Sequence, residues 1–227
     1  MSETKQKKVV ILTGAGISAE SGLKTFRDSD GLWENYDVME VASVEAWHRD
    51  RDLVLRFYND RRKQAAQAQP NEGHKALTRL EKHFGVCIVT QNVDSLHEKA
   101  GSSHIIHLHG ELSKVRSTLD ENLIYEWGEN PIGPDDKCEK GSQLRPHIVW
   151  FGEAVPLMET AAREVISADI FMVIGTSLVV YPAAGLLNYV RVGTPVYVID
   201  PHLPDLIPQD NLFMVEEKAS TGVPTLT

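Results

Sequence analysis

The segment that most constrains the fold spans residues 8–26 and reads KVVILTGAGISAESGLKTF. An apolar run rich in β-branched residues ends at the turn Gly14-Ala15-Gly16, and a helix-compatible stretch follows. A buried strand that leads into a glycine turn and a helix N-terminus is typical of a diphosphate cradle. The glycines let the backbone approach the ligand, and the free N–H groups and the dipole of the helix favour anionic oxygens. The segment therefore predicts an α/β unit that binds a nucleotide.

Short apolar runs recur along the rest of the chain, at residues 9–12, 86–89, 105–108, 148–151, 170–174 and 196–199. Several are apolar throughout, which is typical of parallel strands that are covered on both faces. Helical patterns lie between them, over 71–84, 96–100, 157–168 and 183–192, with Asn71 as an N-cap and Gly101 as a C-cap signal. The alternation predicts an α/β fold with a doubly wound, parallel, Rossmann-like sheet.

Two stretches interrupt this alternation and predict a small second lobe made of two insertions. Residues 33–69 read as a helical insertion, and residues 113–145 are polar and rich in turns. The Rossmann-like domain then comprises residues 1–32, 70–112 and 146–227.

The composition excludes several functional classes. With 227 residues, 42% of them apolar and 24% charged, the chain can bury one core and a small lobe. The net charge of −9 argues against a nucleic-acid binder. No apolar run reaches the ~20 residues of a membrane helix, no signal peptide is evident, and two cysteines make no disulfide framework. We expect a cytoplasmic monomer that binds neither nucleic acid nor membranes.

The glycine spacing differs from that of an ordinary dehydrogenase, because Gly14 and Gly16 are followed by Gly22 and no second strand ending in an acidic residue is evident. A tight turn without a ligand is the alternative. Polar groups at other predicted strand ends favour a nucleotide crevice, since ligands of parallel sheets bind at the C-terminal strand ends. These groups are Gln91-Asn92-Val93-Asp94, Gly175-Thr176-Ser177 and Asp200. Asp94 could equally cap the following helix.

Among nine histidines, His109 stands at a predicted strand end beside a glycine. On a strand it would share a face with His107, and the pair could bind a metal, although no third ligand is evident nearby. A structural role is the alternative. Its place at the predicted crevice favours a general base, because imidazole titrates near neutral pH.

Arg61 occupies the inward stripe of the predicted helix over 52–67, together with Val54, Phe57, Tyr58 and Ala65. Arginine is rare at such positions without an anionic partner. A structural ion pair or a snorkelling side chain is one interpretation. The other is a pocket for a carboxylate, to which Tyr58 adds a hydroxyl.

Together these motifs resemble the sirtuin family of NAD-dependent protein-lysine deacylases, from about Lys8 to Ala219. The matching motifs are GAGIS at 14–18, TFR at 25–27, QNVD at 91–94, HGE at 109–111, VWFGE at 149–153 and GTS at 175–177. The pair Tyr58 and Arg61 matches the Tyr-x-x-Arg marker of the subgroup that prefers acidic acyl groups.

The resemblance implies that NAD is consumed as a co-substrate. The acyl-lysine oxygen attacks the ribose carbon as nicotinamide leaves, and His109 acts as general base on a ribose hydroxyl. Acylated-lysine proteins or peptides would be the substrates, with desuccinylation, demalonylation and deacetylation as activities. The products would be free lysine, nicotinamide and O-acyl-ADP-ribose.

The resemblance also assigns binding residues. NAD would contact Gly14, Ala15, Gly16, Ile17, Ser18, Glu20, Thr25, Phe26, Arg27, Trp33, Gln91, Asn92, Val93, Asp94, Gly175, Thr176, Ser177, Asp200 and Ala219. The acyl group would contact Tyr58 and Arg61. The extended substrate backbone would pair with Val149, Trp150, Phe151 and Gly152.

The sequence departs from the family at the zinc site of the small lobe and at Asp200, where asparagine is usual. Most sirtuins carry two cysteine pairs, but residues 113–145 contain only Cys138, and Ser117 stands where a first cysteine is expected. One cysteine cannot supply four zinc ligands. We therefore expect no zinc and a lobe held by packing of Leu119, Ile124, Tyr125 and Trp127, with Cys87 in the core.

Other functions remain open on this sequence. An NAD glycohydrolase or ADP-ribosyltransferase would release nicotinamide without an acylated peptide. A non-catalytic NAD-sensing module would bind NAD without turnover. A conventional dehydrogenase is disfavoured by the glycine spacing.

Overall fold

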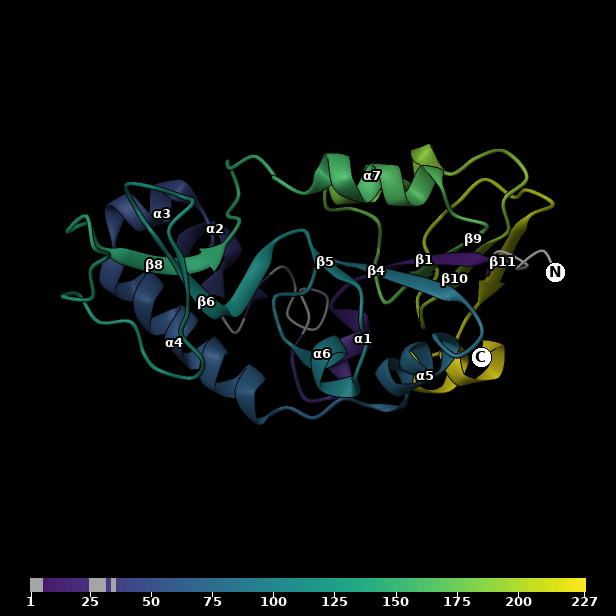
Figure 1. The fold of residues 1–227 in the computed structure, drawn as a ribbon, viewed down its shortest axis with the longest axis horizontal. Helices are drawn as coiled ribbons and strands as arrows, with labels where there is room; N and C mark the ends of the chain where they lie inside the picture. Colours follow the sequence, from purple (N-terminus) through teal and green to yellow (C-terminus); the bar gives the residue numbers. More distant parts are fainter. Residues whose placement is uncertain (1–5, 25–31, 34–35) are drawn as a thin grey trace, which may run out of the picture.

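The computed structural model describes residues 6–24, 32–33 and 36–227. The predicted NAD contacts Thr25, Phe26 and Arg27 lie outside the described residues. The centre is a six-stranded sheet with the order β11-β10-β9-β1-β4-β5, in which all neighbours are parallel (Figure 1). Its strands are β1 (Lys8–Thr13), β4 (Gly85–Thr90), β5 (Ile105–His107), β9 (Ile170–Ile174), β10 (Val196–Ile199) and β11 (Leu212–Val215).

Helices cover both faces of this sheet, as Figure 1 shows. One face packs against α7 (Met158–Ile166) and the 3-10 helix η2 (Ala183–Tyr189). The other packs against α1 (Gly16–Ala19), α5 (Glu72–Leu80), α8 (Ala219–Gly222) and η3 (Val223–Leu226). Strand β1 serves both layers, because Val10 and Leu12 point to the first and Val9 and Ile11 to the second. The predicted doubly wound α/β fold is confirmed.

A separate small lobe lies beside the sheet (Figure 1). Its sheet is antiparallel with the order β7-β6-β8, formed by β7 (Ile124–Glu126), β6 (Gly110–Ser117) and β8 (Leu144–Ile148). It also contains β2 (Leu32–Trp33), β3 (Tyr36–Asp37), α2 (Val38–Val41), α3 (Val44–Arg49) and α4 (Arg51–Gln67). Helix α6 (Leu96–Ala100) belongs to the large lobe and packs on α5.

The core of the small lobe is aromatic. Trp47, Tyr58 and Trp150 are buried together, and the rings of Trp47 and Trp150 lie 5.4 Å apart. The prediction that Leu119 and Ile124 hold the lobe is wrong, because these side chains are 69% and 44% exposed. Tyr125 and Trp127 do pack against the core as partly buried residues.

Several predicted elements end elsewhere than expected. The helix capped by Asn71 stops at Leu80, and the helix expected over 183–192 is a 3-10 helix. The apolar run 148–151 is not a strand of the large sheet. Its backbone N–H groups donate instead to His109 O, Glu153 Oε2 and Ala42 O, so the run crosses between the lobes while Trp150 fills the core of the small one.

None of the helices in the described part of the chain combines the length and the apolar character of a membrane span.

Candidate functional site

A cavity of about 1040 Å³ opens at the C-terminal ends of β1, β4, β9 and β10 and extends into the small lobe. This is the edge where ligands of open parallel sheets bind. The predicted residues that line it are Gly14, Ala15, Gly16, Ser18, Glu20, Trp33, Tyr58, Arg61, Gln91, Asn92, Val93, Asp94, His109, Val149, Trp150, Phe151, Gly152, Gly175, Thr176, Ser177 and Asp200. The tertiary structure thus brings together segments that are far apart in the sequence.

The glycine turn after β1 packs backbone to backbone against the loop after β9. A Cβ on Gly14 would lie 2.6 Å from Thr176 Cβ, and a Cβ on Gly16 would lie 2.7 Å from Gly175 Cα. Gly175 itself has a φ of 64°, and it has no space for a side chain, because a Cβ there would lie 2.4 Å from Ile17 N. The glycines are therefore required by the contact between two loops. The expected contribution of a helix dipole is small, because α1 has only four residues.

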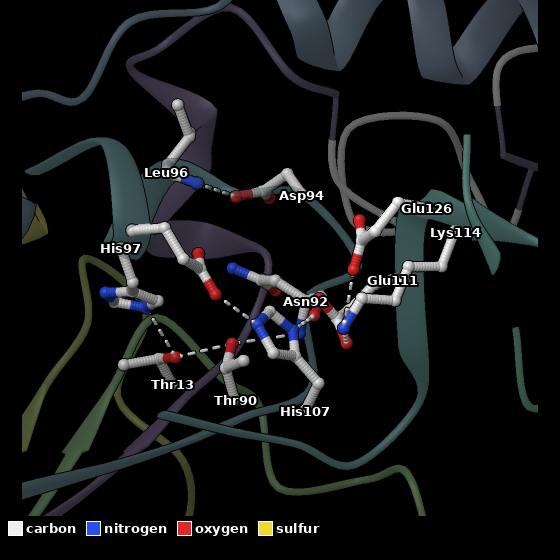
Figure 2. Close-up of polar contacts among 11 residues, drawn as sticks. Thr13, Thr90, Asn92, Asp94, Leu96, His97, His107, Glu111, Lys114 and Glu126 are labelled. Carbon is white, nitrogen blue, oxygen red and sulfur yellow. Dashed lines mark hydrogen bonds and ion pairs between the residues drawn. The ribbon is translucent and has the colours of Figure 1, made fainter. Parts of the chain in front are cut away.

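The loop after β4 carries polar groups that line the cavity. Figure 2 shows two of them, Asn92 and Asp94. Asn92 Nδ2 donates to Gly14 O and to Ser18 Oγ, both at 3.1 Å. Ser18 Oγ donates to Asp94 Oδ2 at 3.0 Å, and Asp94 Oδ1 accepts from Leu96 N at 3.0 Å. The N-cap of α6 is Ser95, and Asp94 lines the cavity while its carboxylate accepts from the first N–H of the helix. Burial raises its pKa, and these two hydrogen bonds oppose the rise.

His109 lies just past the end of β5 and lines the cavity. Its Nδ1 is 3.0 Å from Gln91 O, so Nδ1 carries the proton and donates, because a carbonyl only accepts. Burial lowers the pKa of His109, and the bond to Gln91 opposes that effect. The imidazole is thus neutral near pH 7, with Nε2 as its proton-accepting atom. The expectation that His107 shares a strand face with His109 is wrong, since β5 ends at His107.

At the small-lobe end, Tyr58 and Arg61 come from successive turns of α4. Tyr58 is fully buried and its hydroxyl accepts from Trp150 Nε1 at 3.1 Å. Burial raises the pKa of Tyr58, so the phenol keeps its proton. The guanidinium carbon of Arg61 lies 5.2 Å from the centre of the Trp33 ring, and Arg61 Nη1 donates to Gln64 Oε1 at 3.1 Å.

The next residue along the helix, Arg62, points in a different direction and has different partners. Its Nε donates to Leu112 O at 2.6 Å and its Nη1 donates to Asn130 O at 3.0 Å. Its side chain is almost completely buried, and burial lowers its pKa to about 10. Arg62 therefore joins α4 to the rest of the small lobe, whereas Arg61 lines the cavity.

Glu153 organises the segment from Val149 to Gly152. Its carboxylate accepts from Trp150 N at 2.8 Å, from Arg116 Nη2 at 3.0 Å and from Arg145 Nη1 at 2.6 Å. Burial alone would raise the pKa of Glu153, but the two arginines lower it. Sequence reasoning missed this residue as part of the site. Arg116 and Arg145 can be seen in the sequence of the insertion, but nothing in the sequence shows that both converge on the Glu153 carboxylate.

Two predicted contacts do not line the cavity. Ile17 is buried under the sheet, and Ala219 is buried at the start of α8. The structure adds cavity residues that the sequence analysis did not select, among them Lys24, Glu153, Tyr181, His202 and Lys218. Asp200, which does line the cavity, accepts from His202 N at 2.8 Å. The lysines and His202 follow no recognisable pattern, and their proximity comes from the tertiary structure.

Comparisons with known proteins agree with this architecture. The sequence matches the model of the Sir2 family over residues 14–182. It is 55% identical to an NAD-dependent protein deacylase of Bacteroides thetaiotaomicron, over 97% of this chain and 96% of that protein. An ADP-ribose complex of a mutant Sir2 homologue superimposes with a TM-score of 0.89 and 42% identity, covering 100% of this chain and 95% of the other. An NAD complex of a Sir2 homologue gives 0.87 and 43%, covering 98% and 88%.

Proposed function

This chain belongs to the Sir2 family and is an NAD-dependent protein deacylase, and we propose that it acts on protein lysines that carry acidic acyl groups such as succinyl or malonyl. The observation that carries the acidic preference is Arg61, a cation on the inward face of α4 that lines the cavity with its side chain only 6% exposed. Acetyl-lysine is then a poorer substrate of the same site.

The chemistry of this end of the cavity supports a carboxylate ligand. Arginine presents a planar set of donors that matches a carboxylate in a bidentate arrangement. The surrounding rings of Trp33 and Tyr58 lower the local polarity, which strengthens attraction between opposite charges. Tyr58 adds a neutral hydroxyl, since its pKa is raised.

We assign the role of general base to His109. Its Nδ1–H is held by Gln91 O, and this contact fixes the ring and leaves Nε2 as the basic atom. When bound, NAD supplies the ribosyl centre to which the acyl group is transferred. Around it, Asn92 and Asp94 offer an amide and a carboxylate that suit ribose hydroxyls, and a cavity of about 1040 Å³ is large enough for a dinucleotide.

We further propose that the small lobe folds without zinc. Cys138 Sγ lies 3.4 Å from Ser117 Oγ and 3.2 Å from Ser142 Oγ. One sulfur and two hydroxyls are a donor set that does not fit a structural zinc, which requires four sulfur or nitrogen ligands. Packing, Arg62 and the ion pairs of Glu153 take the place of the metal.

The test is a panel of succinyl-, malonyl- and acetyl-lysine peptides incubated with NAD, with the nucleotide product identified by mass spectrometry. We expect O-succinyl- or O-malonyl-ADP-ribose in excess over O-acetyl-ADP-ribose. In the Arg61→Met variant, kcat/KM should fall roughly ten- to a hundredfold for the acidic peptides and much less for acetyl peptide, because a charge-assisted contact is lost.

Arg56→Met is the matched control, because Arg56 is an exposed arginine of the same helix outside the cavity. It should leave the ratio of the substrates unchanged. Equal losses on all peptides in Arg61→Met would assign Arg61 a structural role. Release of nicotinamide without any peptide would favour the NAD glycohydrolase alternative.

A further inference from the structure

Three successive peptide carbonyls of the loop after β4 are held by one short segment of the chain. The carbonyls of residues 91–93 face residues 107–112, which run from the last residue of β5 into the first residues of β6. The contacts are His109 Nδ1 to Gln91 O at 3.0 Å, His107 Nδ1 to Asn92 O at 3.2 Å, and Leu112 N to Val93 O at 2.8 Å. Two of the three donors are imidazoles, and only His109 lines the cavity.

His107 is held on both of its ring nitrogens, as Figure 2 shows. Nδ1 must donate to Asn92 O, because a carbonyl oxygen only accepts. Nε2 lies 2.6 Å from Glu98 Oε1, and a carboxylate also only accepts. A ring that donates from both nitrogens is an imidazolium, and its side chain is only 8% exposed. A neutral ring with its proton on Nδ1 would turn the lone pair of Nε2 toward the Glu98 carboxylate, and the two would repel each other.

The charges around His107 favour this state. Burial on its own lowers the pKa of His107, but the hydrogen bond and charge of Glu98 and the charge of Glu111 raise it. Lys114, on the same strand as Glu111, donates to Glu111 Oε1 at 2.8 Å and lies 3.6 Å from Glu126 Oε1. The lysine thereby balances those two carboxylates and leaves Glu98 to the imidazole. Two buried groups complete the surroundings: the Asp94 carboxylate, which attracts the imidazolium, and the neutral ring of His97.

The carbonyl that His107 holds belongs to Asn92, whose side chain organises the cavity. Asn92 Nδ2 bonds Gly14 O and Ser18 Oγ, and Ser18 Oγ bonds Asp94. The orientation of the peptide between residues 92 and 93 sets where the backbone places both Asn92 and Asp94. If this peptide rotated, Asn92 would leave Gly14, and the amide and carboxylate that face the cavity would separate.

We propose that His107 is a positioning residue of the deacylase reaction, in which Glu98 orients the imidazole and the imidazole fixes the Asn92 carbonyl. The pair acts from behind the cavity wall and contacts neither substrate nor the reacting atoms. The inference rests on the proposed function, because the loop that it positions is the one assigned to NAD. It predicts that the loop is arranged for NAD only while His107 is protonated.

The side chains available at position 107 separate this role from a general effect on folding. In His107→Asn, the amide nitrogen falls near the place of Nδ1 and can still donate to Asn92 O. In His107→Gln it falls near the place of Nε2, so the contact with Glu98 can persist while the contact with Asn92 is lost. His107→Leu loses both contacts. His104→Leu is the control, because His104 is exposed and outside the loop contacts.

Calorimetric NAD affinity of the full chain is the first readout. We expect His107→Gln and His107→Leu to bind NAD about tenfold more weakly, which is typical of losing a hydrogen bond from a charged group. His107→Asn should recover most of the affinity, and His104→Leu should match the wild type. If His107→Gln and His107→Leu bind NAD as tightly as the wild type, or His107→Asn binds it as weakly as His107→Leu, the proposal is overturned.

Nitrogen-15 NMR of the wild-type imidazoles is the second readout and needs no variant to fold. His107 should show two protonated nitrogens at pH 6.5 and should lose the proton at a pH above 6.5. NAD affinity should fall over the same pH range, and Glu98→Gln should move that range to lower pH. A His107 that is neutral at pH 6.5 contradicts the proposal. These readouts stay independent of the proposed function, whose own failure would be a wild-type protein that binds NAD but deacylates no peptide.

Discussion

His107 and His109 are close in sequence, yet their surroundings leave the His109 imidazole neutral and favour the charged form of His107. Both rings donate from Nδ1 to a carbonyl of the same loop. The rings differ in their surroundings. Nε2 of His107 contacts the Glu98 carboxylate, whereas the ring of His109 lines the cavity. His109 can be singled out in the sequence by its place beside a glycine at a predicted strand end, but the Glu98 carboxylate that sets His107 apart comes from another element, α6.

The first prediction concerns the pH dependence of the reaction. His109 must be neutral to accept a proton, and burial lowers its pKa below 6.5. We expect the rise of kcat/KM with pH to have its midpoint below 6.5, the ordinary pKa of histidine. His109→Ala should lower kcat by roughly 10²–10⁴-fold, the usual contribution of a general base, while calorimetry still detects NAD binding. A rise centred above pH 6.5, or an active His109→Ala variant, would contradict the assignment.

At the scale of elements, helix α4 presents two adjacent arginines to different parts of the lobe. Successive helical residues point about 100° apart, so Arg61 and Arg62 cannot share an environment. Arg62 donates to the backbone carbonyls of Leu112 and Asn130, which lie beyond the end of α4 in the chain. The helix thus uses one arginine for the cavity and the other for attachment.

The second prediction follows from this attachment. Arg62→Met should lower the free energy of unfolding by about 3 kcal/mol, because the buried Leu112 carbonyl and the part-buried contact with the Asn130 carbonyl lose their charged donor. Chemical denaturation measures the change. Activity on acetyl and succinyl peptides should fall together, unlike the selective loss expected in Arg61→Met. A variant of normal stability would show that packing alone attaches α4.

The loops after β1 and β9 give the third prediction. Gly175→Ala introduces a Cβ at a positive φ and 2.4 Å from Ile17 N. Gly193→Ala is the control, because Gly193 also has a positive φ, of 81°, but nothing lies within 4 Å of a new Cβ there. Both should lose about 1–2 kcal/mol from the left-handed backbone, and Gly175→Ala should lose a further 1–3 kcal/mol, roughly, from overpacking. Equal losses in denaturation would mean that the two loops separate easily.

At the scale of the whole molecule, the small lobe provides one wall of the cavity and must keep its shape. The fourth prediction is that EDTA leaves the melting temperature unchanged and that the purified protein contains no stoichiometric zinc by elemental analysis. Removing a structural zinc would withdraw stabilisation on the order of 10 kcal/mol, which a melting curve detects easily. A lower melting temperature in EDTA, restored by zinc, would contradict a zinc-free lobe.

Much of the large lobe follows from its sequence because its signals are local. Continuous apolar runs mark β1, β4, β9 and β10, since each strand is buried on both faces. Asn71 caps α5 through Gly73 N, and Gly101 ends α6 in a left-handed conformation with a φ of 98°. The motif residues at the strand ends line one cavity because parallel strands finish at one edge of the sheet.

The packing of the small lobe and the partners of individual side chains could not be predicted from the sequence, because they depend on contacts between residues distant in the chain. Trp150 donates to Tyr58 across 92 positions, and no local pattern encodes that pairing. The run 148–151 has the composition of a strand, but its backbone is bonded to three separate segments. The sequence by itself determined the sheet, its caps and the cofactor edge, which depend on neighbours along the chain. Only the tertiary structure showed that Glu153 holds the segment 149–152 and that Glu98 meets His107, because these contacts depend on partners that folding brings together.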